Sequence, residues 1–64
     1  SIINVGVDVG IKDDSWAVIC IKGKPDYIKF GRFKHNDIRN INDFLKSYKY
    51  ANISTDSPFK NLIF

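Results

Sequence analysis

The amino-acid sequence predicts a small α/β (α+β) fold in which three strands, one helix and a fourth strand follow one another along 64 residues. Three observations lead to this prediction. Apolar residues alternate with polar residues near the N-terminus, which is the period of a half-buried strand. Only short turns separate the first three apolar segments, as in an antiparallel meander. The apolar period then changes to that of a helix between residues 37 and 48.

The predicted strands differ in how apolar they are. In the first, Val5 and Val7 alternate with polar positions that include Asp8, so one face is apolar and the other polar. The second, "SWAVICI", is apolar almost throughout, which predicts burial on both faces or a central place in the sheet. The third carries Lys29 and Arg32, and such charges suit an edge strand. The strands are expected at residues 2–9, 15–21, 27–33 and 51–56.

The predicted helix spans residues 37–48. Ile38, Ile41 and Leu45 recur at helical spacing, and Asn36 is the expected N-cap. A strand-helix-strand connection usually makes its two strands parallel through a right-handed crossover. We therefore expect one sheet with the strand order 3-2-1-4. The fourth strand should run parallel to the first, and the helix should cover one face.

The composition narrows the classes of protein to consider. Ten basic and seven acidic residues give a net charge of +3, which permits contact with nucleic acid without requiring it. No apolar run approaches the roughly 18 residues of a membrane span, so we expect no membrane association. Cys20, the only cysteine, excludes an intrachain disulfide. Its apolar surroundings predict a buried, reduced thiol, and a single cysteine fits a cytoplasmic protein better than a disulfide-rich secreted one.

Two aspartates end strands that the predicted topology makes neighbours. Asp8 lies near the C-terminal end of the first strand, and Asp56 ends the fourth. Neighbouring strands lie about 4.8 Å apart, so parallel pairing would bring both carboxylates to one edge of the sheet. Carboxylate oxygens suit Mg²⁺ or Mn²⁺, which can activate water and stabilise charge on a phosphoryl group. Asp8 and Asp56 are therefore the candidate metal-binding and catalytic residues.

Ordinary structural interpretations compete with these assignments. An aspartate at a strand end often caps a turn or accepts hydrogen bonds from backbone N–H groups. Asp13 and Asp14 are expected in a turn, and His35 is expected to be solvated or capping. Lys12 and Lys60 are expected on the surface, where a lysine can also meet a phosphate. Four aromatic side chains are expected in the core rather than as a surface for stacking bases: Trp16, Phe30, Phe33 and Phe44.

The order of these segments resembles the N-terminal half of the ribonuclease H-like superfamily. The segments that carry the resemblance are "VGVDVG", "SWAVICI" and, after the helix, "ISTDSPF". Within that superfamily the chain is most similar to an uncharacterised group of predicted nucleases of archaea and bacteria. Their first strand reads G-[IV]-D, and their fourth strand ends in a motif like I-D-x-P. The resemblance spans residues 5–59.

The resemblance implies a nuclease that cuts phosphodiester bonds with two metal ions. Asp8 and Asp56 would be the metal carboxylates of the first and fourth strands, and Ser57 and Pro58 would form the corner that follows. Mg²⁺ or Mn²⁺ is the implied cofactor, and nucleic acid is the implied partner. Domains of this superfamily continue beyond the fourth strand and contribute at least one more carboxylate. Residues 1–64 are therefore expected to be one small domain that is a fragment, a truncated version or a protomer completed by another chain.

Two other classes of function stay open. A non-catalytic interaction module would use exposed apolar surface to form a homo-oligomer or to bind another protein. Alternatively, "DVG" at residues 8–10 resembles the phosphate-contacting turn of sugar kinases and actin-like ATPases, which implies part of an ATP-binding domain. Those families often place serine or threonine next, where this chain has Ile11 and Lys12. The segment "TDSP" fits the nuclease-like group better.

Overall fold

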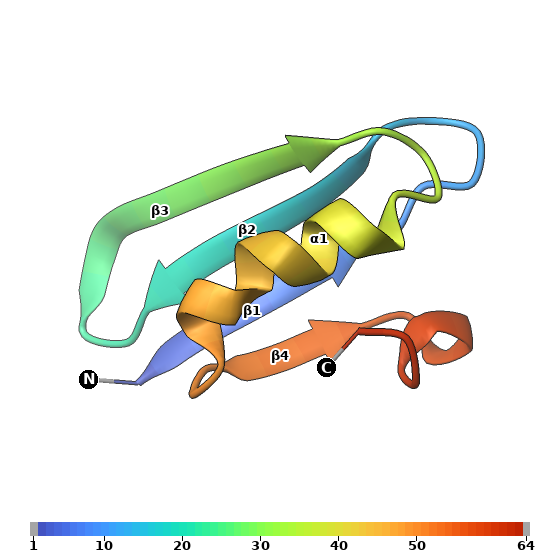
Figure 1. Ribbon diagram of the computed structural model, residues 1–64. Coiled ribbons are helices and arrows are strands. Elements are labelled where there is room, and N and C mark those ends of the chain that lie inside the picture. The colour runs from blue at the N-terminus through green and yellow to red at the C-terminus, as the bar shows by residue number, and fades with distance from the viewer. Residues whose placement is uncertain (1, 64) are drawn as a thin grey trace.

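The computed structural model describes residues 2–63. Its strands form one mixed sheet in the order β3-β2-β1-β4, so the predicted 3-2-1-4 arrangement is confirmed (Figure 1). β1 pairs with β2 in antiparallel and with β4 in parallel orientation, and β3 is antiparallel to β2. The elements are β1 (Ile3–Asp8), β2 (Ser15–Ile21), β3 (Lys24–Phe33), α1 (Ile38–Leu45), η1 (Lys46–Tyr48), β4 (Asn52–Thr55) and η2 (Ser57–Phe59).

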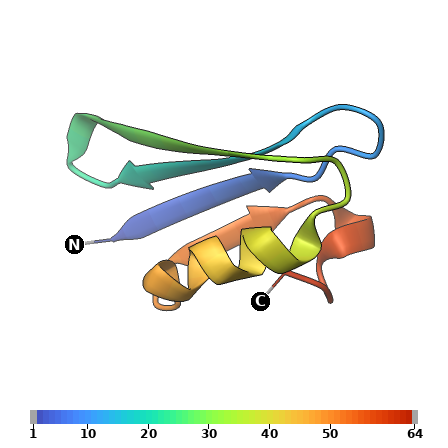
Figure 2. The ribbon, with the colours of Figure 1, turned by 45° about the horizontal axis from the view of Figure 1, so that its top comes forward.

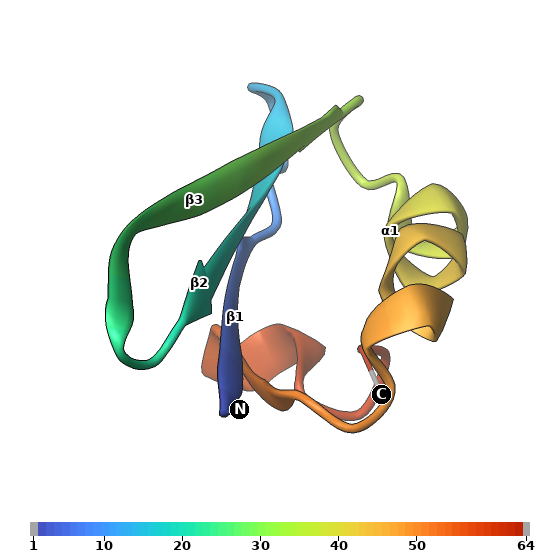
Figure 3. The same ribbon diagram turned by 90° about the vertical axis from the view of Figure 1, so that its left-hand side faces the viewer.

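The helix α1 lies against one face of the sheet, and no described element packs across the opposite face within residues 2–63 (Figure 3). The core is therefore a single layer between α1 and the inward-facing positions of β1 and β2. This arrangement follows from the period-two pattern of the strands and the 3.6-residue pattern of the helix. The buried apolar side chains are Val5, Val7, Val9, Ala17, Ile19, Ile41, Leu45 and Ile63.

The segment after β4 turns back toward α1 (Figure 2). The side-chain amide of Asn42 in α1 donates a hydrogen bond to the carbonyl of Leu62 at 2.8 Å. This contact fixes the returning segment and places Ile63, which is 5% exposed, in the core beneath the helix. The last turn of the described chain is thus part of the packed layer.

The helix begins one residue later than predicted. Asn36 has a left-handed backbone with φ 55°, and its N–H donates to the Gly10 carbonyl at 2.9 Å. Asp37 is the N-cap, because its carboxylate accepts a hydrogen bond from the backbone N–H of Asn40 at 3.4 Å. After eight residues α1 tightens into the turn η1. No helix within residues 2–63 is long and apolar enough to cross a membrane.

The third strand is longer than predicted, because it begins at Lys24 and includes Pro25. The connecting turn is confined to the residues around Gly23, which adopts φ 85°, a backbone angle that suits glycine. Proline has no N–H to donate to a neighbouring strand, so it is tolerated mainly on edge strands. β3 is an edge of the sheet, as its charged residues predicted.

β2 is central, as predicted, but it is buried on one face only. Ser15, Ala17 and Ile19 point under the helix, whereas Trp16 and Cys20 lie on the open face. Of the two alternatives that its apolar sequence left open, the central position is confirmed and burial on both faces is not found, because within residues 2–63 one helix covers one face. The prediction that Cys20 is buried is wrong for the same reason.

The four aromatic residues expected in the core divide between the two faces. Phe33 and Phe44 pack against the core, with ring centroids 5.4 Å apart in an edge-to-face contact. Trp16 is 41% exposed and Phe30 is 61% exposed, because both stand on the face opposite α1. For these two residues the prediction of a core position is wrong, and the open face carries large apolar groups.

Candidate metal centre

Asp8 and Asp56 meet at one end of the open face. The parallel register of β1 and β4 ends with Val7 beside Thr55, so Asp8 and Asp56 are the next residues along the two strands. Asp56 keeps an extended backbone, with φ −63° and ψ 145°. Both residues are exposed, and both line the same hollow. The structure therefore places the two sequence-predicted aspartates at the same end of adjacent strands, on the border of one hollow.

In the described part of the chain, the local structure does not use the side chains of these two aspartates for helix capping or for ion pairs. Asp56 immediately precedes η2, yet its side chain makes no capping hydrogen bond. The two salt bridges within residues 2–63 use Asp14 and Asp43, and neither involves Asp8 or Asp56. Both strand-end carboxylates therefore remain available for an external ligand.

The register that aligns the two aspartates is supported by a side-chain contact at the opposite end of the strands. The amide of Asn52 in β4 donates to the side-chain oxygen of Asn4 in β1 at 3.3 Å. Register is the variable that matters here, because a slip of one residue would turn one of the aspartates to the other face of the sheet. The asparagine pair opposes such a slip between β1 and β4.

A buried serine holds the loop that follows Asp8. The hydroxyl of Ser15, which is 0% exposed, accepts a hydrogen bond from the Gly10 N–H at 2.8 Å. The same hydroxyl donates to the Lys34 carbonyl at 3.2 Å. Ser15 thereby joins the β1–β2 loop to the segment after β3. A buried hydroxyl with both interactions satisfied is a structural feature that fixes where β1 ends.

Gly10 is required by close packing within the same loop. A Cβ at this position would overlap the carbonyl oxygen of Asp13 and would lie 2.7 Å from that of Asp14. Real Cβ atoms do not approach backbone oxygens so closely, so the loop cannot keep this shape with any other residue at Gly10. The glycine that ends "VGVDVG" therefore has a steric reason in the path of the loop.

The open face is organised in rows that cross the strands. One row contains Asp8, Trp16 and Arg32, which are successive register partners on β1, β2 and β3. Asp56 extends this row on the β4 side. The next row is formed by four register partners: Ser54, Gly6, Val18 and Phe30. Acidic and polar groups thus occupy the β4 half of the face, and aromatic and apolar groups, together with Arg32, occupy the half over β2 and β3.

A hollow of about 400 Å³ lies between these halves. Gly6 is on its central strand, where a Cβ would meet no heavy atom within 4 Å. Trp16 and Val18 border the hollow on the β2 side, and the two aspartates border it at one end. Its lining residues are Gly6, Val7, Asp8, Trp16, Val18, Ser54, Thr55 and Asp56.

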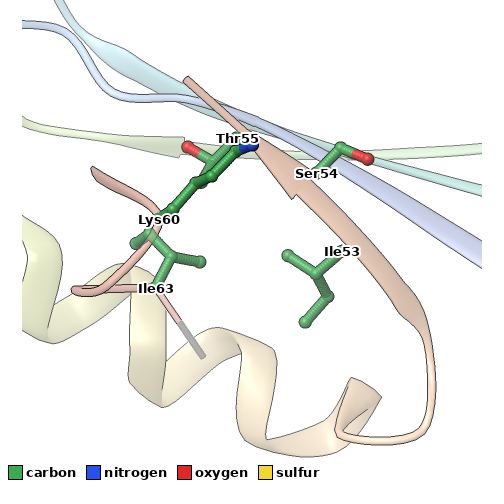
Figure 4. Close-up of a pocket in the computed structure, with 5 residues that line it drawn as sticks. All are labelled: Ile53, Ser54, Thr55, Lys60 and Ile63. Atoms are coloured by element: carbon green, nitrogen blue, oxygen red, sulfur yellow. The ribbon is translucent and has the colours of Figure 1, made fainter. Parts of the chain in front are cut away.

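A second hollow, of about 520 Å³, lies beside β4 near the returning segment (Figure 4). Ile53 and Ile63 face one another across it, and Lys60 extends alongside the strand toward Thr55, while the Ser54 side chain points away from Lys60 (Figure 4). The Thr55 hydroxyl is buried and has no hydrogen-bond partner within the described part of the chain. The structure thus places Lys60 in a different hollow from the one that both aspartates line.

The other ionisable candidate residues do not line the hollow that contains Asp8 and Asp56. Lys12 lines a hollow in the β1–β2 loop together with Asp8, Asp13 and Asp14. Asp14 forms a salt bridge with Arg32 at 2.5 Å. His35 is exposed in the turn before α1. Within residues 2–63 no group of three or more His, Cys, Asp or Glu side chains could hold a metal ion.

The carboxylate oxygens of Asp8 and Asp56 fit one particular mode of cation binding. The described residues do not form a closed metal site made only of protein groups. Mg²⁺, however, usually keeps several waters and is held by one or two carboxylates together with substrate phosphate oxygens. Asp8 and Asp56, adjacent and exposed, match that requirement. Comparisons with protein families, with curated proteins and with solved structures find no match to this chain.

Sequence reasoning missed two residues that shape this site. Gly6 was visible as a glycine inside a strand, which commonly marks a close approach to the backbone. Ser15 was visible as a polar residue at an inward position of a strand with period two. Its two hydrogen bonds could not be read from the sequence, because both partners are backbone groups of separate loops.

Proposed function

We propose that the chain is a ribonuclease H-like domain that binds Mg²⁺ or Mn²⁺ through Asp8 and Asp56 and acts on phosphodiester bonds of nucleic acid. One observation carries the proposal. The two carboxylates follow register partners on adjacent parallel strands, and they line one hollow on an open face. A fold that needed these residues only for structure would use them as caps or ion pairs, and the described contacts do neither.

The chemistry follows from charge. Two carboxylates on neighbouring strands repel one another, and a bound divalent cation relieves that repulsion. Such a cation, when bound, stabilises charge on a phosphoryl group and favours the ionised form of its water. Asp8 and Asp56 would hold it and orient it toward the hollow. Lys12, which lines a hollow in the β1–β2 loop together with Asp8, would attract the phosphate backbone of the substrate.

The sequence supports the same proposal independently. The segments "VGVDVG" and "ISTDSPF" resemble the metal-carboxylate strands of the ribonuclease H-like superfamily, and the resemblance selects the same two aspartates. The net charge of +3 is compatible with a polyanionic substrate.

Paramagnetic broadening by Mn²⁺ tests the proposal. We expect Mn²⁺ to broaden the amide resonances at the ends of β1 and β4 selectively, and we expect excess Mg²⁺ to reverse the effect. Asp8→Asn and Asp56→Asn should each abolish the selective broadening. Asp43→Asn is the matched control, because Asp43 is an exposed aspartate on α1 that pairs with Lys46. Broadening that is unchanged in both site variants would refute the proposal.

A non-catalytic interaction module is the second candidate, and one observation favours it. Among residues 2–63, three large apolar side chains are exposed on the open face: Trp16 at 41%, Ile28 at 54% and Phe30 at 61%. Contiguous apolar surface of this kind favours association with a second copy or another protein. Sedimentation velocity tests this candidate, which predicts a concentration-dependent dimer. A monomer that persists at high micromolar concentration would argue strongly against self-association.

A further inference from the structure

We propose that the hollow beside the two aspartates takes an unpaired nucleotide of single-stranded nucleic acid. Its base would stack on Trp16 above Gly6, and its phosphate would lie toward Asp8 and Asp56. The inference rests on the proposed function for its cation, but the base subsite is argued from different residues. It specifies which form of nucleic acid this face recognises.

Gly6 is the first of these residues. The fold itself does not require glycine there, because an added Cβ meets no heavy atom within 4 Å and the backbone has no positive φ. Glycine in a strand interior costs stability relative to residues with a side chain. A glycine that packing does not require, in the floor of a hollow, marks a place where a ligand can approach the backbone.

Trp16 is the second residue that supports the base subsite. It is the only tryptophan in the chain, and its indole is 41% exposed while lining the hollow. The guanidinium carbon of Arg32 lies 5.7 Å from the centroid of the Trp16 ring, and Asp14 holds Arg32 in an ion pair at 2.5 Å. The ring is therefore positioned from the β3 side. Exposed aromatic rings of this kind stack on nucleic-acid bases largely without regard to sequence.

With a divalent cation held by the two aspartates, the end of the hollow favours a nucleotide over a second copy of the chain. A protein surface docked over Trp16 would also cover Asp8 and Asp56, and burying unpaired carboxylates is costly. A phosphate that shares a cation with these carboxylates uses them instead. Bases in a duplex are paired and stacked on one another, so only an unpaired base is free to lie on the Trp16 ring. Phe30, in the next row, is placed for a second base.

Fluorescence of the single tryptophan reports base stacking directly. The wild-type chain is titrated with a short oligothymidylate in Ca²⁺, a hard divalent cation that substitutes for Mg²⁺ in binding. We expect saturable quenching of Trp16. An abasic oligomer of the same length and a blunt duplex should bind at least about fivefold more weakly, because neither offers a free base. Equal quenching by the abasic oligomer would overturn the proposal.

Two variants test the hollow itself, with affinity read from the anisotropy of a labelled oligothymidylate. Trp16→Leu and Gly6→Val should each weaken binding by at least about fivefold. Cys20→Val is the control for Gly6, because Cys20 is exposed on the same open face of the sheet but does not line the hollow. Tyr50→Leu is the control for Trp16, because Tyr50 is 92% exposed outside the hollow.

Both controls should bind within about twofold of wild type. Circular dichroism and urea unfolding verify that every variant is folded. Wild-type affinity in folded Gly6→Val would overturn the proposal. A stable dimer that shields Trp16 and excludes the oligomer would overturn it as well, and would favour a second copy as the occupant of this face.

Removal of the cation separates this inference from the proposed function. In EDTA the base-dependent quenching of Trp16 should persist at lower affinity, and Ca²⁺ should tighten it in wild type but not in Asp8→Asn. Base-dependent quenching with no effect of Ca²⁺ would contradict the proposed metal site and support the base subsite. Cation binding without base-dependent quenching would contradict the base subsite and support the metal site.

Discussion

Asp8 and Trp16 are register partners across the antiparallel pair of β1 and β2, and both stand on the face that α1 leaves open. This pairing sets a carboxylate and an indole side by side at the border of one hollow. The β2 partner of the candidate metal ligand is thus the residue best suited to stack on a base. The same proximity makes Trp16 an internal probe for anything that binds at Asp8.

Replacing Asp8 should make the metal-free chain more stable. Like charges opposed on neighbouring strands are destabilising, so Asp8→Asn should raise the free energy of unfolding by about 0.2–1 kcal/mol in EDTA. Millimolar Mg²⁺ should raise the melting temperature of wild type, because a ligand that binds only the folded state stabilises it. It should not raise that of Asp8→Asn. Thermal unfolding with and without Mg²⁺ measures both effects, and an equal Mg²⁺ response in the two proteins would contradict the assignment.

Ser15→Ala should destabilise the chain by about 1–3 kcal/mol, since it leaves the part-buried Gly10 N–H without its acceptor. The Lys34 carbonyl loses its donor in the same variant. Urea unfolding followed by circular dichroism measures the loss. Ser57→Ala is the control, because Ser57 is exposed in η2 and should change stability by less than about 0.5 kcal/mol. Equal stabilities for the two variants would show that the hydroxyl does not hold the loop.

Gly10→Ala should destabilise the chain by about 1–3 kcal/mol, because the loop must open to admit the added methyl group. Gly6→Ala is the matched control and should be neutral or stabilising, since its Cβ enters open space and alanine suits a strand better than glycine. Urea unfolding of both variants decides the point. A Gly10→Ala protein as stable as Gly6→Ala would contradict the path of the loop after Asp8.

The one-sided core predicts a large difference between two apolar truncations. Leu45→Ala should cost about 2–5 kcal/mol, because Leu45 is fully buried between α1 and the sheet. Phe30→Ala removes a larger side chain, yet it should cost much less, because Phe30 is 61% exposed. Urea unfolding of the two variants measures the difference. A loss for Phe30→Ala as large as that for Leu45→Ala would mean that the open face is covered in solution.

Much of the fold was predictable because its signals are local. The alternation along β1, the short connections and the helical spacing from Ile38 to Leu45 give the element order, and the strand-helix-strand connection through α1 predicts the parallel orientation of β4. The exposure of Trp16, Phe30 and Cys20 was not predictable in this way. An apolar side chain looks the same in the sequence whether its face is covered or bare, and only the position of α1 settles which face is inside.

The pairing of the two aspartates was partly predictable. Their positions at strand ends follow from the sequence, but their alignment depends on the register of β1 and β4, which is fixed by contacts 48 residues apart such as that between Asn4 and Asn52. The hollow was not predictable, because it depends on the absence of a side chain at Gly6 between Ser54 and Val18. The residues that line the hollow come from strands that lie far apart in the sequence, so their arrangement in rows across the sheet appears only in the folded structure.

Terbium luminescence sensitised by Trp16 tests the central claim most directly. Tb³⁺ prefers the oxygen ligands that Mg²⁺ prefers, and it emits on tryptophan excitation only when it binds close to the indole. We predict saturable emission that Mg²⁺ or Mn²⁺ competes away, that Asp8→Asn and Asp56→Asn each abolish, and that Asp43→Asn preserves. Emission that persists undiminished in both site variants, or no sensitised emission from the folded wild-type chain, would contradict a cation site at Asp8 and Asp56.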